Sequence, residues 1–278
     1  MPRRLRLDAE LVRRGLARSR DHAADLIAAR QVTIAGAVAT KPATAVTTDA
    51  ALVVTQHPDR PDYVSRGGHK LAGALDVFTP AGLAVEGRRC LDAGASTGGF
   101  TDVLLCRGAA EVVAVDVGYG QLAWSLRQDP RVRVHDRVNV RELTAADVGG
   151  RVDIVVADLS FISLTLVLDA LIGVVTPDGD LCLMVKPQFE VGKDRVGRGG
   201  VVRDTDLRID AVTGVATAAA GRGWGSQGVT ASPLPGPAGN VEYFLWLRAE
   251  EPRLTHHDIA EAVRPTPPAG AAGERVAP

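Results

Sequence analysis

Two lysines and two acidic residues occupy positions where polar side chains could carry out proton chemistry. Asp158 and Lys186 each end an apolar run, Lys70 follows closely on a glycine pair, and Glu242 precedes another apolar run. A lysine takes a proton from a hydroxyl only in its neutral form, and burial or a second nearby cation lowers the pKa of a lysine. Two acids beside two lysines could hold one amine neutral and orient it. Taken singly, each residue has a simpler interpretation, because a lysine at a strand end is usually solvated and Asp158 could cap a helix.

A second group of residues predicts a site for a nucleoside cofactor. The stretch Leu91–Phe100 (Leu-Asp-Ala-Gly-Ala-Ser-Thr-Gly-Gly-Phe) lies between an apolar run and a helical pattern, and Asp116 ends the next apolar run. Glycines allow close backbone approach, a helix N-terminus offers free N–H groups, and an acid at the second strand can accept from ribose hydroxyls. Ser96 stands where the dinucleotide fingerprint needs glycine, so a pyrophosphate would lose its close approach. The pattern favours a cationic, phosphate-free nucleoside such as S-adenosylmethionine, and the alternative is a plain βαβ turn.

These residues need a framework that brings the ends of strands together. Short apolar runs alternate with helical patterns from residue 88 onward, which predicts an α/β fold with a doubly wound parallel sheet. Ligands of such sheets bind at the carboxyl ends of the strands, where Asp158 and Lys186 would lie. The last run follows another strand without a helix between, so we expect it to be antiparallel. The expected strands are 89–94, 111–117, 131–135, 152–158, 180–186, 226–231 and 241–248, and the expected helices are 99–107, 119–127, 163–174 and 205–221.

Residues 1–58 form a separate basic module. They carry nine Lys or Arg and five Asp or Glu, a net charge of +4, against −5 for the remainder of the chain. Two helical patterns followed by short strand patterns predict two helices against a small sheet. Basic residues gathered in one small module favour a polyanion partner, although a solvated helix face has a similar composition. Beyond this module we expect a linker at 59–64, a large domain at 65–252 and a disordered tail at 253–278.

Composition argues against several classes of protein. The chain has 278 residues, of which 46% are hydrophobic, enough for one large and one small core. Its three cysteines and six histidines show no metal-ligand spacing, so we expect a reduced, cytoplasmic protein without a metal. No apolar run is long enough to cross a membrane, and no apolar signal core follows the basic N-terminus.

The N-terminal module resembles the S4 RNA-binding domain. The resemblance rests on Arg6-Leu7-Asp8, on Leu16–Arg20 (Leu-Ala-Arg-Ser-Arg), on Val32–Gly36 and on Lys41-Pro42. It implies that arginines near the two helices face an RNA backbone, and the candidates are Arg4, Arg6, Arg18 and Arg20. In the turn Ala35-Gly36 an alanine replaces the usual asparagine. We expect little consequence, because Gly36 supplies the permissive backbone.

The whole chain resembles the TlyA, or hemolysin A, family, in which an S4 domain precedes an FtsJ-like class I methyltransferase domain. Beyond the S4 module the resemblance rests, in order, on Ser65–Leu71, Asp92–Phe100, Asp116–Leu122, Asp158–Ser163 and Lys186–Glu190. It implies a Rossmann-like sheet of seven mostly parallel strands. It also implies S-adenosylmethionine-dependent 2′-O-methylation of cytidine riboses in 16S and 23S rRNA of ribosomal subunits, an activity linked to susceptibility to capreomycin and viomycin.

The same resemblance assigns roles to individual residues. Lys70, Asp158, Lys186 and Glu242 match the Lys-Asp-Lys-Glu tetrad of FtsJ-like ribose methyltransferases. Lys186 would act as the base, Asp158 and Lys70 would position it and tune its charge, and Glu242 would complete the network. The implied cofactor residues are Asp92, Gly94 and Ser96 at the methionine end, Asp116 at the ribose, Asp136 and Asn139 at the adenine, and Gly98, Gly99 and Phe100 in the rest of the turn.

Other interpretations stay open on the sequence alone. An S4 module also precedes pseudouridine synthases, which need a catalytic aspartate in a mostly antiparallel fold without such a glycine turn. An S4 protein with a non-catalytic methyltransferase fold would carry many of the same motifs. The family name suggests a pore-forming hemolysin, for which the chain shows no span and no secretion signal. The segment 192–200, with three cations among four glycines, is either an RNA-contacting lid or a flexible surface loop.

Overall fold

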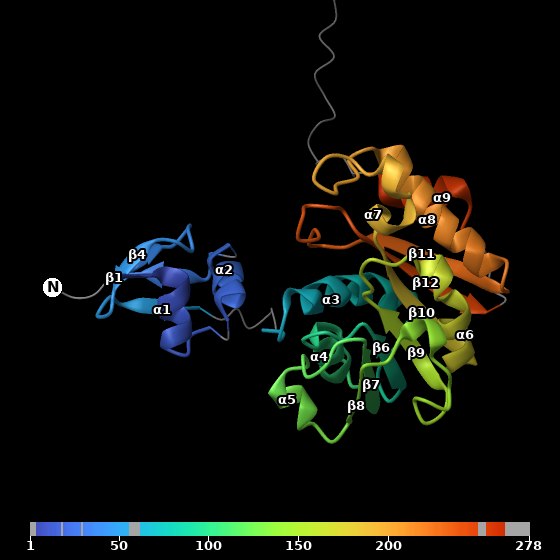
Figure 1. The fold of residues 1–278 in the computed structure, drawn as a ribbon, viewed down its shortest axis with the longest axis horizontal. Helices are drawn as coiled ribbons and strands as arrows, with labels where there is room; N and C mark the ends of the chain where they lie inside the picture. Colours follow the sequence, from blue (N-terminus) through green and yellow to red (C-terminus); the bar gives the residue numbers. More distant parts are fainter. Residues whose placement is uncertain (1–3, 18, 29, 56–61, 250–253, 265–278) are drawn as a thin grey trace, which may run out of the picture. The chain divides into compact units, whose positions relative to one another are not determined.

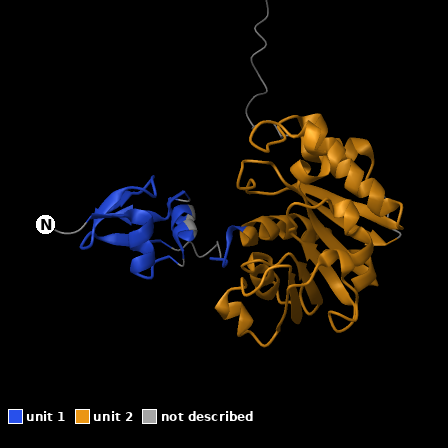
Figure 2. Cartoon of the chain, in the orientation of Figure 1, with its two compact units in different colours: residues 1–66 blue, residues 67–278 orange. Residues whose placement is uncertain are grey.

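The computed structural model describes residues 4–17, 19–28, 30–55, 62–249 and 254–264, which belong to two compact units (Figures 1 and 2). The first unit comprises residues 1–66 and the second residues 67–278, and each has its own hydrophobic core. The division falls within the first turn of α3 (Arg66–Phe78). Of the predicted linker, residues 59–61 lie outside the described residues.

Two short helices and short strands make up the first unit, the architecture expected for an S4 domain. Leu7, Leu11 and Ile27 of the helices are buried together with Val32 and Val46 of the strands. One strand pair is β1–β4, and in the other sheet β2 lies between β3 and β5, all antiparallel. The elements are β1 (Arg4–Arg6), α1 (Leu7–Arg13), α2 (Arg20–Ala28), β2 (Val32–Ile34), β3 (Ala37–Val38), β4 (Ala45–Thr47) and β5 (Leu52–Val54).

The turn between the two helices of this unit agrees with the sequence-based prediction, and the turn between β2 and β3 differs from it. Gly15 follows α1 with φ +69°, and the Ser19 hydroxyl accepts from the His22 N–H (3.1 Å) at the start of α2. The β2–β3 turn differs, because Ala35 as well as Gly36 has a positive φ, +48° and +85°. A residue with a Cβ is strained in this region. Gly36 is therefore not the only position of this turn that needs a permissive backbone, and the expectation that alanine here has little consequence stays a prediction.

One seven-stranded sheet forms the centre of the second unit and confirms the predicted fold class (Figure 1). The strand order is β11-β12-β10-β9-β6-β7-β8, and β12 is antiparallel to both its neighbours, as predicted for the last strand. The order reverses at β6, which lies between β7 and β9 and so marks the switch point where such sheets bind ligands. The strands are β6 (Arg89–Ala93), β7 (Glu111–Asp116), β8 (Val132–Asp136), β9 (Val152–Ala157), β10 (Val175–Val185), β11 (Trp224–Ala231) and β12 (Tyr243–Ala249).

Helices cover both faces of this sheet, because alternate side chains of each strand point to opposite faces. On one face Leu91 and Leu245 lie in a common core with side chains of α6, α8 and α9. On the other face the ring of Phe100 in α4 lies 5.9 Å from that of Phe244, centroid to centroid. The remaining helices are α4 (Gly99–Cys106), α5 (Trp124–Arg127), α6 (Leu168–Val174), α7 (Pro187–Glu190), α8 (Thr205–Ala220) and α9 (His256–Val263), with 3-10 turns η1 (Thr79–Ala81), η2 (Val140–Glu142), η3 (Leu164–Leu166) and η4 (Lys193–Arg195).

Two helices of the second unit differ from the sequence-based expectation, one in its existence and one in its first residue. α3 was not predicted, although Leu71, Leu75 and Phe78 are buried at helical spacing. A helix was predicted at 119–127, but α5 begins only at 124. The cause lies before it, where the Gly118 N–H donates to Asp116 Oδ1 (2.6 Å) and holds the chain in a turn after β7.

A third helix lies in the segment that was predicted to be disordered. α9 begins with a capping box in which the side chains of Thr255 and Asp258 each accept from the other's backbone N–H. Ile259, Ala260 and Val263 are buried against the core of the sheet. The predicted disorder of 253–278 is therefore wrong for residues 254–264, and residues from 265 onward lie outside the described part.

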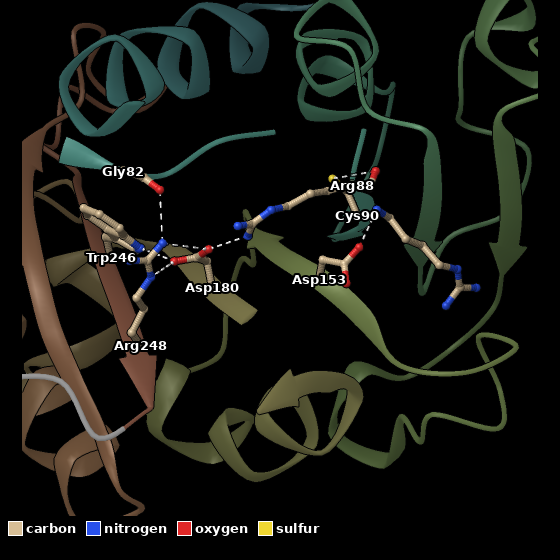
Figure 3. A network of polar contacts seen from close by, with 8 residues as sticks. Gly82, Arg88, Cys90, Asp153, Asp180, Trp246 and Arg248 are labelled. Carbon is tan, nitrogen blue, oxygen red and sulfur yellow. Dashed lines mark hydrogen bonds and ion pairs between the residues drawn. The ribbon is translucent and has the colours of Figure 1, made fainter. Parts of the chain in front are cut away.

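A fully buried carboxylate joins three strands at the amino-terminal side of the parallel sheet (Figure 3). Asp180 of β10 accepts from Trp246 Nε1 (2.7 Å) and Arg248 Nε (2.6 Å) of β12, and from Arg88 Nη1 (2.7 Å), directly before β6. A buried charge is tolerated only when it is paired in this way. Because Lys186 follows the other end of β10, this network supports the sheet and takes no part in the site described next.

Candidate active site

The four predicted catalytic residues form two lysine–carboxylate ion pairs. Lys70 Nζ lies 2.5 Å from Glu242 Oε2, and Lys186 Nζ lies 2.5 Å from Asp158 Oδ1. Each lysine is 7% exposed and Glu242 only 1%, whereas the side chain of Asp158 is 25% exposed. Lysines are almost never buried to this degree unless they are paired. The structure is therefore inconsistent with the simpler interpretation of solvated lysines at strand ends.

The register of the sheet explains why residues so far apart in sequence meet. β10 and β12 are antiparallel and pair up to their ends at this edge, so Lys186, which follows β10, and Glu242, which precedes β12, lie at adjacent positions. Asp158 follows β9, the neighbour of β10 on its other side. Lys70 comes from the buried face of α3. The carboxyl ends of two parallel strands, one antiparallel strand and a helix thus build the site.

The glycine turn lies against this site at the switch point between β6 and β9. Gly94 has φ +87°, and a Cβ at this position would come within 2.7 Å of the Asp158 carbonyl oxygen. Gly98 has φ +99° and would place a Cβ 2.3 Å from Leu126 of α5. Gly94 is therefore required for the close approach of the glycine turn to the strand end that carries Asp158, whereas Gly98 is favoured by its positive φ, because a leucine side chain could move.

Asp116 holds the glycine turn in place through backbone contacts. Its Oδ2 accepts from the Ser96 N–H (2.8 Å) and its Oδ1 from the Gly118 N–H (2.6 Å). Ser96 itself has φ +48°, a left-handed conformation that is strained for a residue with a Cβ. Each carboxylate oxygen has a second lone pair, so Asp116 can still accept from a ligand hydroxyl. Such strain and such paired acceptors are typical of ligand-binding turns.

Asp92 is a fully buried carboxyl group with one unsatisfied oxygen. Its Oδ2 accepts from the Thr101 N–H (2.8 Å) and hydroxyl (2.7 Å), whereas its Oδ1 has no hydrogen-bond partner. Burial raises the pKa of Asp92 from 3.8 to about 7, and the nearby charges of Asp158 and Asp116 add to the rise. Buried acceptors without a partner are rare in proteins, and Asp92 Oδ1 is one of them among the described residues.

The structure engages the other predicted cofactor residues in local contacts. Asp136 Oδ2 accepts from Arg127 Nη2 (2.5 Å), and Asn139 Oδ1 accepts from the Arg141 N–H (3.1 Å), which caps η2. The side chain of Phe100 is 3% exposed and packs in the core, and Gly99 is the first residue of α4. Gly99 and Phe100 can therefore offer only backbone groups at the helix start.

Three of the four predicted RNA-contacting arginines lie in the described part of the first unit. Arg6 Nη2 (2.8 Å) and Arg20 Nη2 (3.1 Å) converge on Asp8 Oδ2, and their side chains are 51% and 60% exposed. Arg4 is exposed at the start of β1. Arg18 lies outside the described residues. The structure thus gathers Arg6 and Arg20 around one buried aspartate, where each keeps guanidinium donors exposed.

Three further residues of the site were in motifs that the sequence analysis quoted without giving them a role. Ser160 Oγ accepts from Lys186 Nζ (3.0 Å). Phe161 is 91% exposed, with a φ of +64°. Glu190 Oε2 accepts from the Ser163 hydroxyl (2.5 Å) and its Oε1 from the Leu164 N–H (2.8 Å). The sequence did contain a signal for Ser160, because its hydroxyl lies two positions after Asp158. Nothing in the sequence indicated the exposure of Phe161.

The segment 192–200 is held at its end. Asn240, 2% exposed, accepts from the Val202 N–H (2.9 Å) and donates to the Gly200 carbonyl (2.8 Å). Asn240 lies two positions before Glu242, so the end of this segment is attached to the chain that enters the active site. Both interpretations of the segment, RNA contact or surface loop, remain compatible with this attachment.

Comparison with known proteins agrees with this geometry. The FtsJ-like methyltransferase model matches residues 63–249 and the S4 domain model matches residues 5–52. The 16S/23S rRNA (cytidine-2′-O)-methyltransferase TlyA of Mycobacterium tuberculosis is 64% identical over 264 residues, which cover 95% of this chain and 97% of the relative. The chain belongs to the TlyA family. A 23S rRNA (cytidine-2′-O)-methyltransferase TlyA of Campylobacter jejuni is 34% identical over 66% of this chain and 70% of its own.

Solved structures of the family share the fold. A candidate hemolysin from Streptococcus thermophilus has a TM-score of 0.73 at 37% identity, covering 95% of both chains. A second one, from Lactococcus lactis, has a TM-score of 0.67 at 40% identity and covers 73% of this chain and 98% of its own. Within the described residues, no helix is long and apolar enough to cross a membrane, and no group of His, Cys, Asp or Glu has the arrangement of a metal site.

Proposed function

We propose that this TlyA-family protein transfers a methyl group from S-adenosylmethionine to the ribose 2′-oxygen of cytidines in 16S and 23S rRNA. The observation that carries the proposal is the pair of buried lysine–carboxylate ion pairs beside the glycine turn at the switch point of the sheet. The substrate comes from the relatives, of which the more similar one is named for both rRNAs and the Campylobacter protein for 23S rRNA alone.

The residues present fit S-adenosylmethionine. The unsatisfied Asp92 Oδ1 suits the methionine ammonium group, directly or through a water molecule. Asp116 suits the ribose hydroxyls, and the absence of a phosphate-binding glycine at Ser96 suits a cofactor without phosphates. Asp136 and Asn139 lie after β8 and would approach the adenine. The cofactor supplies an electrophilic methyl group on a positively charged sulfur.

Lys186 is the base in this proposal. Its neutral amine takes the proton from the ribose 2′-hydroxyl while the oxygen lone pair forms the new bond to the methyl carbon. The carbon–sulfur bond would break with its electrons on sulfur, so the positive charge of the sulfonium is lost, and Lys186 then releases the proton it took to solvent. Asp158 orients the amine of Lys186, and the buried Lys70–Glu242 ion pair holds the neighbouring side of the site in place. Much of the acceleration comes from alignment of oxygen, carbon and sulfur.

RNA binding is assigned to the first unit in this proposal. Arg4, Arg6, Arg18 and Arg20 contact phosphates, and each phosphate contact adds nearly one unit to the log–log salt dependence on duplex DNA and about 0.7 on single strands. A chain that starts at residue 64 should retain cofactor binding and lose methylation of ribosomal subunits. Full activity of the shortened chain would show that the first unit is not the recognition element.

The experiment that tests the activity uses labelled S-adenosylmethionine with 30S and 50S subunits and with free rRNA, followed by mapping of the modified ribose. Lys186→Ala should bind the cofactor and transfer no methyl group. Lys186→Arg should also be inactive, because a guanidinium does not act as a base near neutral pH. Near-normal turnover by either variant would overturn the assignment of the base. Cofactor and RNA binding by the native chain without any transfer would favour a binding protein with a non-catalytic fold.

A further inference from the structure

Two segments of the active site, 158–164 and 186–190, are joined by five contacts. Asp158 and Ser160 both contact the Lys186 amine, the rings of Phe161 and Phe189 lie 5.3 Å apart, and Glu190 accepts from Ser163 and Leu164. The Lys-Asp-Lys-Glu tetrad accounts only for the contact between Asp158 and Lys186. The other four join the loop after β9 to the turn that carries the base.

The contact with Ser160 bears on the direction of the base. A neutral lysine amine has two N–H bonds and one lone pair, arranged tetrahedrally around nitrogen with the Cε bond. Lys186 Nζ donates a hydrogen bond to Ser160 Oγ (3.0 Å) and forms an ion pair with Asp158 Oδ1 at 2.5 Å, where Oδ1 accepts no hydrogen bond. The ion pair alone would leave the amine free to rotate about the Cε–Nζ bond. Because Ser160 fixes one N–H bond and the charge of Asp158 attracts the second, the lone pair has one direction left.

We propose that Ser160 is a positioning residue that, together with Asp158, directs the lone pair of Lys186 toward the ribose 2′-hydroxyl, and that Glu190 holds Ser160 in place by fixing the loop. This inference rests on the proposed function, in which Lys186 is the base. Ser160 touches neither the ribose nor the cofactor in this role. It acts through Lys186.

The loop needs a restraint of this kind because its backbone is strained. Phe161, the next residue after Ser160, has φ +64°, a conformation that costs about 1 kcal/mol or more for a residue with a Cβ. Glu190 offsets this strain, since its two oxygens hold the Ser163 hydroxyl and the Leu164 N–H, and α7 joins it directly to Lys186. Lys186, Ser160 and Glu190 thus belong to one closed ring of contacts.

The test compares Ser160→Ala, Ser160→Thr and Glu190→Ala with the native chain, and Thr165→Ala serves as a control. Thr165 has a hydroxyl directly after the segment 158–164, and this hydroxyl contacts Ser163 and not Lys186. Ser160→Ala should lower kcat by roughly 10- to 100-fold, the range for loss of one positioned catalytic contact. KM for rRNA and the Kd of S-adenosylmethionine should stay within twofold. Ser160→Thr keeps the hydroxyl and should restore kcat, and Thr165→Ala should retain it.

Two readouts separate positioning from a structural effect. The loss in Ser160→Ala should fall on kcat while KM for rRNA is unchanged, whereas a structural effect would also raise KM. Glu190→Ala should lower kcat as well, and the double variant should be no slower than Ser160→Ala alone, since both act on one contact. Melting temperatures identify any variant that fails to fold. If Glu190→Ala fails to fold, the comparison of Ser160→Ala with Ser160→Thr decides the question.

The outcomes distinguish this inference from the proposed function. An inactive Lys186→Ala with a fully active Ser160→Ala would overturn the role of Ser160 and leave the base assignment intact. An active Lys186→Ala would overturn both. Equal losses of kcat in Ser160→Ala and Ser160→Thr, or additive losses in the double variant, would show that the loop requires serine for packing and not for direction.

Discussion

The buried carboxyl group of Asp92 makes the stability of the second unit depend on pH. Its pKa in the folded protein is raised by burial from 3.8 to about 7. Between these values the folded state binds a proton that the unfolded chain has released, so stability falls as pH rises. The stability that protonated Asp92 contributes is fully present below pH 3.8 and is lost as pH rises through about 7. Ionised Asp92 therefore destabilises the protein above neutrality.

The magnitude follows from this shift. About three pKa units correspond to about 4 kcal/mol at pH 8, of which about 2 kcal/mol is already present at pH 5. Asp92→Asn cannot ionise, so it escapes this penalty, although its buried amide adds an unsatisfied donor that costs about 1–3 kcal/mol at every pH. The variant should therefore gain about 2–3 kcal/mol relative to the native chain between pH 5 and pH 8.

Urea unfolding at several pH values, followed by tryptophan fluorescence, measures this difference. Trp124, Trp224 and Trp246 are the three tryptophans of the chain, and all belong to the second unit, so the signal reports that unit alone. Asp178→Asn is a matched control, because Asp178 is exposed on β10 and its removal should leave the pH dependence unchanged. A constant difference between Asp92→Asn and the native chain from pH 5 to pH 8 would refute the reasoning.

Cofactor binding gives a second check on the same group. A cation bound near Asp92 Oδ1 favours the ionised carboxyl, so the affinity for S-adenosylmethionine should rise up to tenfold per pH unit below about 7 and level off above it. Calorimetry of the native chain and of Asp92→Asn at pH 5.5, 6.5 and 7.5 tests this. Affinities that change equally with pH in both proteins would place the ammonium group elsewhere.

Three further changes have expected outcomes. Asp116→Ala should weaken S-adenosylmethionine binding by about 1–3 kcal/mol in calorimetry, and unchanged affinity would place the ribose elsewhere. Phe161→Ala should lower kcat/KM for rRNA by the 1–3 kcal/mol typical of one stacked base while cofactor affinity is unchanged, since the ring is 91% exposed; equal activity would exclude contact with RNA. Ala35→Asn should stabilise the first unit by about 0.5–1 kcal/mol, because asparagine tolerates φ +48°; hydrogen exchange of the β2 amides checks it, and faster exchange would contradict it.

Local residue patterns were sufficient for the strands, whereas the candidate catalytic set was assigned through the family resemblance. Apolar runs of β-rich composition mark strands because a parallel sheet is buried on both faces, and every predicted strand is present within a few residues. Polar residues directly after such runs, as at Asp158 and Lys186, lie at the carboxyl edge by topology alone. These relations depend on neighbours in sequence and on the rules of the sheet, so they can be worked out without coordinates.

Helix boundaries at glycines depended on tertiary contacts. Gly73, inside α3, lies so close to Pro233 that a Cβ there would come within 2.7 Å of its ring, a contact that no local pattern reveals. α5 starts late because Asp116 captures the Gly118 N–H. The α9 capping box, in contrast, was visible in Thr255 and Asp258 and was outweighed by the Ala, Pro and Gly content of the tail.

The sequence by itself determined which residue types are available for catalysis, and the tertiary structure decided how they pair. Nothing in the order of the chain says that Lys70 meets Glu242 and Lys186 meets Asp158, because the pairing depends on the antiparallel register of β12 and on the packing of α3. The same holds for Ser160, whose hydroxyl becomes a partner of Lys186 only when the strained turn at Phe161 is held. Burial, which gives Asp92 its raised pKa, is likewise a property of the assembled fold, since it depends on atoms from many separate segments.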